Sequence, residues 1–261
     1  MSAVAGTLLA IHAPKMGGSW FTAVCRELGL ADWQTVVDAH PDAHSHSTYA
    51  QLSKLHHLPS VAMVRHPLPF YVSHFLHMGP DLDYIGQWFD KHFYGYEWAE
   101  YSGGVRLDTP RPREVRHAFE LWLGAVLKGT RDVNLLGGRP GGERFTFTGP
   151  LWSNVIRHWY EGVEAIVHLE RAYEDLPWLP LVSHPGGMAR ARFVTGVGTV
   201  TGVVRLGERV ERPFATVTRE AFPPANVSER WHGCLADWYT PELVRAVQEA
   251  DGPMMARLGY R

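Results

Sequence analysis

The sequence predicts an α/β protein built on a central, mainly parallel sheet. Three short apolar runs, at residues 7–13, 60–67 and 164–170, are each followed by a polar loop and a stretch with helical spacing. Short apolar runs of this kind are typical of buried strands, and strand–loop–helix units connect parallel strands. Two longer amphipathic stretches, 113–128 and 151–163, have the spacing of helices that cover such a sheet.

The composition indicates a globular protein with one domain over residues 1–261. The chain is 45% hydrophobic and 20% charged, and its formal net charge is -2, which gives no sign of a nucleic-acid or membrane-surface partner. Two cysteines are too few for a disulfide framework. No charged-then-apolar segment opens the chain, and no apolar run is long enough to span a membrane. We therefore expect a cytoplasmic protein without nucleic-acid or membrane partners.

The first strand and the helix expected at 19–28 are joined by a loop with the sequence PKMGGS. Backbone N–H groups at the start of a helix can hold an anion, and glycines let the backbone approach it closely. Lys15 adds a charge and Ser19 a hydroxyl donor. The alternative is a tight βα turn whose glycines serve only its geometry. The loop also departs from the ATP-binding pattern GxxxxGK[ST], because its lysine precedes the glycines.

The second strand ends in a similar way, in the segment VRHPLPFYVSHF. Arg65 stands at the strand end, and Ser73 follows eight residues later in the expected helix. Ligands of open parallel sheets lie beyond the carboxyl ends of the strands, so we expect Lys15 and Arg65 to face one crevice. The arginine fork suits a phosphate group, although pairing of Arg65 with a nearby acid is an alternative.

Two stretches do not fit a minimal α/β core. Residues 84–101 carry eight aromatic side chains among Gly, Asp and Glu. Such a patch suits a ligand with an aromatic or apolar body, and it equally suits packing in the core or at a subunit interface. Residues 186–212 are rich in Gly, Val, Thr and Arg, and we interpret them as irregular or as short hairpin strands.

The last expected element is a C-terminal helix. Thr240 is a suitable N-cap, Pro241 fits the first helical position, and Glu242 favours the positive end of the helix dipole. Gly252 and Pro253 are expected to bend or break this helix.

Taken in order, these motifs resemble those of the sulfotransferases that use 3′-phosphoadenosine 5′-phosphosulfate (PAPS). PKMGGSW is similar to their 5′-phosphosulfate loop, and Arg65 and Ser73 have the spacing of their 3′-phosphate motif. YEDL at 173–176, after a strand, is similar to their adenine-contacting segment, and YTPELV…GY resembles their C-terminal region. The resemblance implies a three-layer α/β sandwich that is P-loop NTPase-like, with an acceptor-site or lid region at about 79–112.

The resemblance also implies a role for each matching residue. Lys15 would hold the 5′-phosphosulfate and neutralise the leaving phosphate, and the backbone that follows it would cradle the phosphate. Arg65 and Ser73 would bind the 3′-phosphate. The late Arg-Lys-Gly cluster of the family is missing, and Arg190 or Arg192 are candidates to replace it. The implied donor-site residues are Lys15, Met16, Gly17, Gly18, Ser19, Trp20, Arg65, Ser73 and Tyr173, with Trp20 and Tyr173 at the adenine.

Transfer of a sulfuryl group to a hydroxyl needs a proton acceptor, and histidine suits this role near neutral pH. The family base lies in a Lys-Thr-His-Leu-Pro segment, and placing SHSTYAQL on it makes His46 the first candidate for the catalytic base. His44 and His40 stand behind it, and His44 occupies the position of the family lysine. The three histidines also have a spacing that can ligate zinc, but a solvated loop is the commoner explanation, so we expect no metal.

The sequence therefore predicts an enzyme that transfers a sulfuryl group from PAPS to a hydroxyl, or with less support an amine, of a small-molecule or glycan acceptor. One alternative is a small-molecule kinase, although the chain lacks the Walker lysine placement and a Mg²⁺-binding acid motif. The other is a catalytically inactive nucleotide-binding protein, which would fit the missing Arg-Lys-Gly cluster and the altered base segment.

Overall fold

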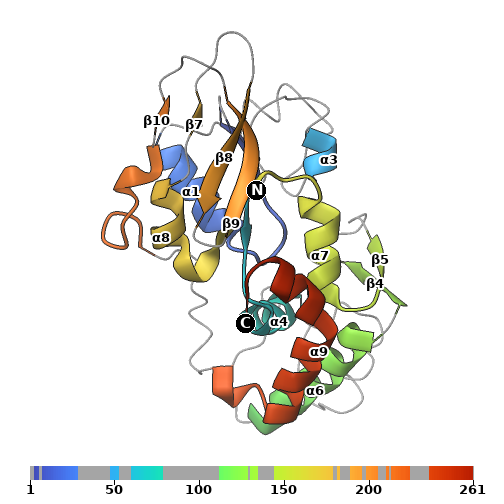
Figure 1. Cartoon of the computed structure of the whole chain (residues 1–261). Coiled ribbons are helices and arrows are strands. Elements are labelled where there is room, and N and C mark those ends of the chain that lie inside the picture. Colours follow the sequence, from blue (N-terminus) through green and yellow to red (C-terminus); the bar gives the residue numbers. More distant parts are fainter. Residues whose placement is uncertain are drawn as a thin grey trace. The chain divides into compact units, whose positions relative to one another are not determined.

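The chain folds as two compact units, each made from two separate stretches (Figure 1). The first unit is Met1–His66 with Val155–Asn226, and the second is Pro67–Asn154 with Val227–Arg261. The computed structural model describes residues 3–5, 8–28, 48–52, 60–78, 112–128, 130–134, 144–178, 181–182, 189–195, 198–204, 210–211, 213–223 and 235–260.

The first unit contains the parallel sheet that the sequence predicts. Its strands are β1 (Ala3–Ala5), β2 (Leu8–Ile11), β3 (Ser60–Val64) and β6 (Ala165–His168), in the order β1-β2-β3-β6. The three predicted strands β2, β3 and β6 pair in parallel, and β1 adds an antiparallel edge that we did not predict. The α/β class is therefore confirmed, with the carboxyl ends of β2, β3 and β6 at one edge.

Both faces of this sheet are buried, as a parallel sheet requires. Every residue of β3 is buried. Helix α1 (Gly18–Glu27) follows β2 and packs on the face that carries Val61 and Met63. The side chains of α1 in this core are Trp20, Phe21, Val24 and Cys25. Burial raises the pKa of the Cys25 thiol to about 12, so this cysteine is an inert core residue.

The other elements of the first unit are short. The stretch 186–212, which we interpreted as irregular or as short hairpin strands, contains the antiparallel pair β8 (Ala189–Thr195) and β9 (Gly198–Val204). The described elements are α3 (Tyr49–Leu52), the end of α7 (Leu151–Tyr160), η2 (Leu169–Arg171), α8 (Ala172–Asp175), η3 (Leu176–Trp178), β7 (Leu181–Val182), β8 (Ala189–Thr195), β9 (Gly198–Val204), β10 (Val210–Glu211) and η4 (Pro213–Thr216).

The second unit is built around three helices, α4 (Pro67–Met78), α6 (Pro112–Lys128) and α9 (Pro241–Arg257), which contact one another (Figure 1). Their shared core is aromatic: Phe75 and Phe119 each pack edge-to-face against Trp238. A hairpin of β4 (Thr130–Asn134) and β5 (Arg144–Thr148), which we did not predict, and the short η5 (Leu235–Asp237) complete the described part.

Helix α9 runs unbroken through Gly252 and Pro253, so the break that the sequence allowed does not occur. Its start is as expected: the Thr240 hydroxyl accepts the Leu243 N–H at 3.3 Å, and Pro241 is the first helical residue. An internal proline costs about 3 kcal/mol. The helix does not break because this cost is offset by burial of Val247, Asp251, Met254 and Met255 on the same helix.

A glycine turn ends α9. Gly259 has a φ of 76°, and its N–H donates to the Ala256 carbonyl oxygen (3.1 Å). The Tyr260 N–H donates to the Met255 carbonyl oxygen (2.9 Å), which completes a Schellman motif. The helix therefore ends at Arg257 for a local reason. Among the described helices, none is long and apolar enough to cross a membrane.

Candidate functional site

The loop between β2 and α1 is a tight turn with a lysine in an unfavourable backbone conformation. The Met16 N–H donates to the Ala13 carbonyl oxygen at 3.4 Å, which closes a four-residue turn over Pro14 and Lys15. Proline suits the second position of such a turn. Lys15, in the third position, has a φ of 63°, a region that L-residues avoid and glycine adopts freely. The turn geometry alone would therefore favour glycine where the chain has lysine.

The two glycines of the loop, by contrast, are explained by packing. A Cβ atom on Gly17, which has a φ of 87°, would lie 2.7 Å from Leu169 Cδ1. A Cβ atom on Gly18 would overlap the ring of His12. The φ of Gly17 and its contact with Leu169 favour glycine there, and the His12 ring leaves no room for a Cβ atom at Gly18, whatever the loop binds. Neither packing nor turn geometry explains why the loop has a lysine at position 15.

A second cation lies close to Lys15. Arg65 directly follows β3, the neighbour of β2 in the sheet. The pKa of Lys15 is lowered from 10.5 to about 8, first by burial and then by the nearby positive charge of Arg65. The structure therefore brings Lys15 and Arg65 together at the carboxyl edge, as predicted, in an arrangement that an anion would stabilise.

The start of α1 adds backbone donors beside these cations. Gly17 is the N-cap residue and supplies no side-chain cap, so the first N–H groups of α1 are not satisfied by it. Ser19 is exposed in the first turn, whereas Met16 is fully buried and its N–H donates to the Ala13 carbonyl oxygen. This arrangement suits a phosphate-like anion more than a neutral ligand.

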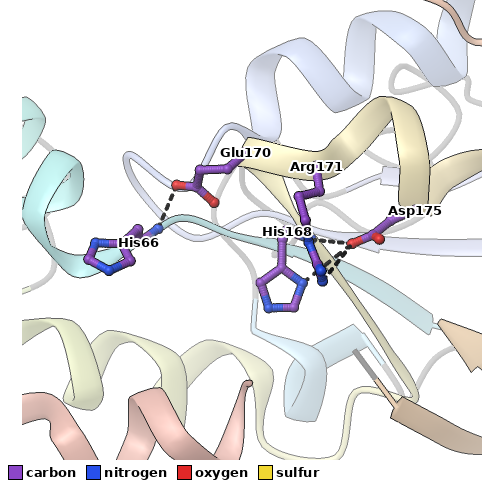
Figure 2. Close-up of polar contacts among 5 residues, drawn as sticks. All are labelled: His66, His168, Glu170, Arg171 and Asp175. Carbon is purple, nitrogen blue, oxygen red and sulfur yellow. Dashed lines mark hydrogen bonds and ion pairs between the residues drawn. The ribbon is translucent and has the colours of Figure 1, made fainter. Parts of the chain in front are cut away.

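Carboxylates hold the same edge of the sheet in place (Figure 2). The exposed Glu170, just after β6, accepts the His66 N–H at 2.7 Å and so links the end of β6 to the end of β3. Burial lowers the pKa of His66, and the Glu170 carboxylate acts in the opposite direction. His66 is therefore mostly neutral at neutral pH.

Asp175 of the YEDL segment closes the turn after β6. Its carboxylate accepts the His168 N–H at 3.2 Å, lies 3.4 Å from His168 Nδ1 and is 4.0 Å from the Arg171 guanidinium (Figure 2). His168 and Asp175 are both buried. Sequence reasoning did not single out either residue, and only the seven-residue spacing between strand end and Asp175 hinted at this turn.

The two residues predicted at the adenine lie together. The rings of Trp20 and Tyr173 meet edge-to-face with centroids 5.4 Å apart. The Tyr173 hydroxyl donates to the Phe222 carbonyl oxygen (2.7 Å), and the Arg219 guanidinium lies 5.5 Å from the centre of the Tyr173 ring. Trp20 is 6% exposed and belongs to the core of this unit, whereas Tyr173 is half-buried. Of the two rings, Tyr173 has more surface to offer a ligand.

The other predicted residues lie in the second unit, on β8 or outside the described residues. Ser73 is half-buried on α4, in the second unit. Arg190 and Arg192 lie on β8. The candidate bases His40, His44 and His46, the aromatic patch 84–101 and all of the region 79–112 except Pro112 lie outside the described residues. Within the described ranges, no group of three or more His, Cys, Asp or Glu side chains is placed to hold a metal ion.

Comparison with known proteins adds no assignment. No protein-family model, curated protein or solved structure matches this chain.

Proposed function

We propose that this protein is a PAPS-dependent sulfotransferase whose donor site is the Lys15 loop and the Arg65 strand end. The observation that carries the proposal is the pair of cations at the ends of adjacent parallel strands, one of them on a turn that would favour glycine. A chain under selection for turn stability alone would not keep a half-buried lysine there. The order of motifs along the sequence points to PAPS as the anion. A three-layer, P-loop NTPase-like fold is part of the proposal.

The residues present fit the donor chemistry. PAPS supplies the sulfuryl group, and its two phosphate-bearing ends require two separated cationic sites. Lys15, with the first amides of α1, would hold the 5′ end and neutralise charge on the leaving phosphate. Arg65 would bind the 3′-phosphate with its fork of donors, and Ser73 remains a sequence-based candidate for the same group. Tyr173 would contact the adenine. The acceptor is a hydroxyl, or with less support an amine, of a small molecule or glycan.

Calorimetric titration with 3′-phosphoadenosine 5′-phosphate (PAP) tests the proposal. We expect PAP to bind at micromolar concentrations, and adenosine 5′-phosphate, which lacks the 3′-phosphate, to bind at least about tenfold more weakly. The absence of PAP binding at tens of micromolar would contradict the proposal. Tighter binding of ATP with Mg²⁺ than of PAP would favour the kinase alternative.

The affinity for PAP is expected to fall as the pH rises through about 8, because Lys15 then loses its proton and its attraction to phosphate. The dissociation constant should rise by up to about tenfold per pH unit above that value. Calorimetry from about pH 7 to 9.5 measures this slope. The matched control is Lys15→Arg, whose guanidinium stays charged throughout and should flatten the slope. A wild-type dissociation constant that does not change over this range would refute the role of Lys15.

The free energy of unfolding of the ligand-free protein is expected to show the opposite trend and to increase with pH. The pKa of Lys15 in the folded chain lies below its ordinary value of 10.5, so between about 8 and 10.5 the folded chain binds fewer protons than the unfolded chain. The destabilising contribution of charged Lys15 is therefore fully present below pH 8 and is relieved as the pH rises through that window. The charged Lys15 ammonium group thus lowers the stability of the folded chain below about pH 8, where it is expected to strengthen PAP binding.

His46 is proposed as the proton acceptor. Replacing His46 by alanine is expected to reduce sulfuryl transfer by about 10²–10⁴-fold, because general base catalysis contributes this much. PAP affinity should stay within about twofold of wild type, since the base contacts the acceptor and not the donor phosphates. Turnover with a hydroxyl acceptor, read as a mass increase, and calorimetry separate the two effects. The control is His117→Ala, at an exposed histidine of α6 that has no proposed role. Retained turnover in His46→Ala would move the base to His44, His40 or another residue.

A further inference from the structure

One buried hydroxyl lies between β2 and β3 at the carboxyl edge of the sheet. The Tyr160 hydroxyl donates to the Met63 carbonyl oxygen (2.6 Å) and accepts the Ala13 N–H (3.3 Å). Tyr160, the last residue of α7, is 5% exposed. Burial raises its pKa well above the ordinary value, although the Ala13 N–H acts in the opposite direction. The hydroxyl is therefore always protonated and makes both hydrogen bonds at once.

The hydroxyl occupies the place of a missing ladder bond. Pairing between β2 and β3 ends at Ile11 and Ala62. Two more residues in the same register would place Ala13 opposite Val64, with its N–H beside the Met63 carbonyl, which are the groups that a continued parallel ladder joins. The Tyr160 oxygen stands between these two groups instead. It keeps the strand ends apart and satisfies both buried polar groups.

The two strand ends held in this way are those that present the cations. Ala13 begins the turn that carries Lys15, and its carbonyl oxygen accepts the Met16 N–H. Its N–H is held by Tyr160, so both polar groups of Ala13 are fixed. On the neighbouring strand, Met63 lies two residues before Arg65. The Tyr160 side chain therefore sets the distance between the Ala13 N–H and the Met63 carbonyl oxygen, just before the Lys15 turn and Arg65.

We propose that Tyr160 is a positioning residue that sets the spacing between the Lys15 turn and the Arg65 strand end for a ligand with two phosphate groups. The identity of the ligand rests on the proposed function, whereas the effect on the loop does not. Without the hydroxyl, the Ala13 N–H and the Met63 carbonyl are either left unpaired or close onto each other. In both cases the spacing changes and the loop loses its anchor.

Tyr160→Phe and Tyr49→Phe form a matched pair for the test. The Tyr49 hydroxyl bonds to Ser60, at the amino end of β3, so its removal perturbs the opposite edge of the same sheet. In Tyr160→Phe we expect backbone amides 13–19 to exchange with solvent about tenfold faster than in wild type, and the dissociation constant of PAP to rise at least about tenfold. In Tyr49→Phe both quantities should stay within about twofold of wild type.

The outcomes separate this inference from the proposed function. If the loop amides of Tyr160→Phe exchange as slowly as those of Tyr49→Phe, the positioning role is overturned. If the wild-type chain does not bind PAP, the proposed function fails, and amide exchange alone then decides the role of Tyr160. If Tyr160→Phe does not fold, wild-type exchange decides. An Ala13 amide as protected as that of Ile11 supports the proposal, and one as fast as that of the exposed Ser19 overturns it.

Discussion

Replacing Lys15 by glycine is expected to make the protein more stable and at the same time to weaken PAP binding at least tenfold, or about 1.4 kcal/mol. The loss of binding follows from removal of the ammonium group beside Arg65. The gain in stability has two sources. Glycine relieves the left-handed backbone at a φ of 63°, worth about 1 kcal/mol, and it also removes a half-buried charge. Calorimetry and urea unfolding measure the two effects on the same samples.

Lys15→Ala is the matched variant, because it removes the same charge but keeps a Cβ atom in the left-handed conformation. It should lose as much affinity as Lys15→Gly and be less stable than Lys15→Gly by about 1 kcal/mol. Equal stability of the two variants would show that the turn carries no strain. Wild-type affinity in either variant would remove Lys15 from the donor site.

Replacing Asp251 by alanine is expected to destabilise the second unit by about 3 kcal/mol or more. Asp251 on α9 is fully buried, and its carboxylate accepts three hydrogen bonds. These come from the Tyr71 hydroxyl on α4 (2.8 Å), and from the N–H (3.1 Å) and hydroxyl (2.6 Å) of Ser153 near the start of α7. The alanine variant leaves these buried donors unsatisfied. Burial and the Asp251 charge both raise the pKa of Tyr71, so its hydroxyl stays a donor.

Urea unfolding of Asp251→Ala against Glu249→Ala checks this prediction. Glu249 is exposed on the same helix, and its replacement should change stability by no more than about 0.5 kcal/mol. Asp251→Asn keeps one acceptor oxygen and should fall between the two variants. A loss below about 1 kcal/mol in Asp251→Ala would mean that the three donors find other partners.

Much of the fold followed from hydrophobic patterning. The runs that contain β2, β3 and β6 are apolar because both faces of a parallel sheet are buried. Their hydrophobic composition was therefore enough to predict them as buried strands. Helices α6 and α7 follow from amphipathic spacing. Strands β4 and β5 were not predicted, because sequences such as TRDVN do not alternate between apolar and polar residues as a half-buried strand does. The continuity of α9 could not be predicted from local sequence, because the low helix propensity of Gly252 and Pro253 is outweighed by burial of other residues on the helix.

The site divides in the same way. Lys15 and Arg65 could be predicted because each is a charged residue shortly after an apolar run that forms a buried strand. Parallel strands bring such loop residues to one edge of the sheet. The roles of Tyr160 and Glu170 could not be predicted, because their hydrogen-bond partners are backbone groups, which every residue carries. These partners belong to Ala13, Met63 and His66. The predicted adenine pair Trp20 and Tyr173 was placed together by the core of the first unit.

The sequence by itself determined the class of the fold, the three parallel strands and the two cations that follow β2 and β3, because these depend on burial and chain order alone. Only the tertiary structure decided which loop residues serve packing and which do not. Gly17 and Gly18, the apparent mark of a phosphate loop, are required by Leu169 and His12. Lys15, in a backbone conformation suited to glycine, is the residue that packing does not explain. Steric contacts between segments that are distant in sequence separate the loop residues needed for packing from those that are not. Such contacts form only when the chain folds.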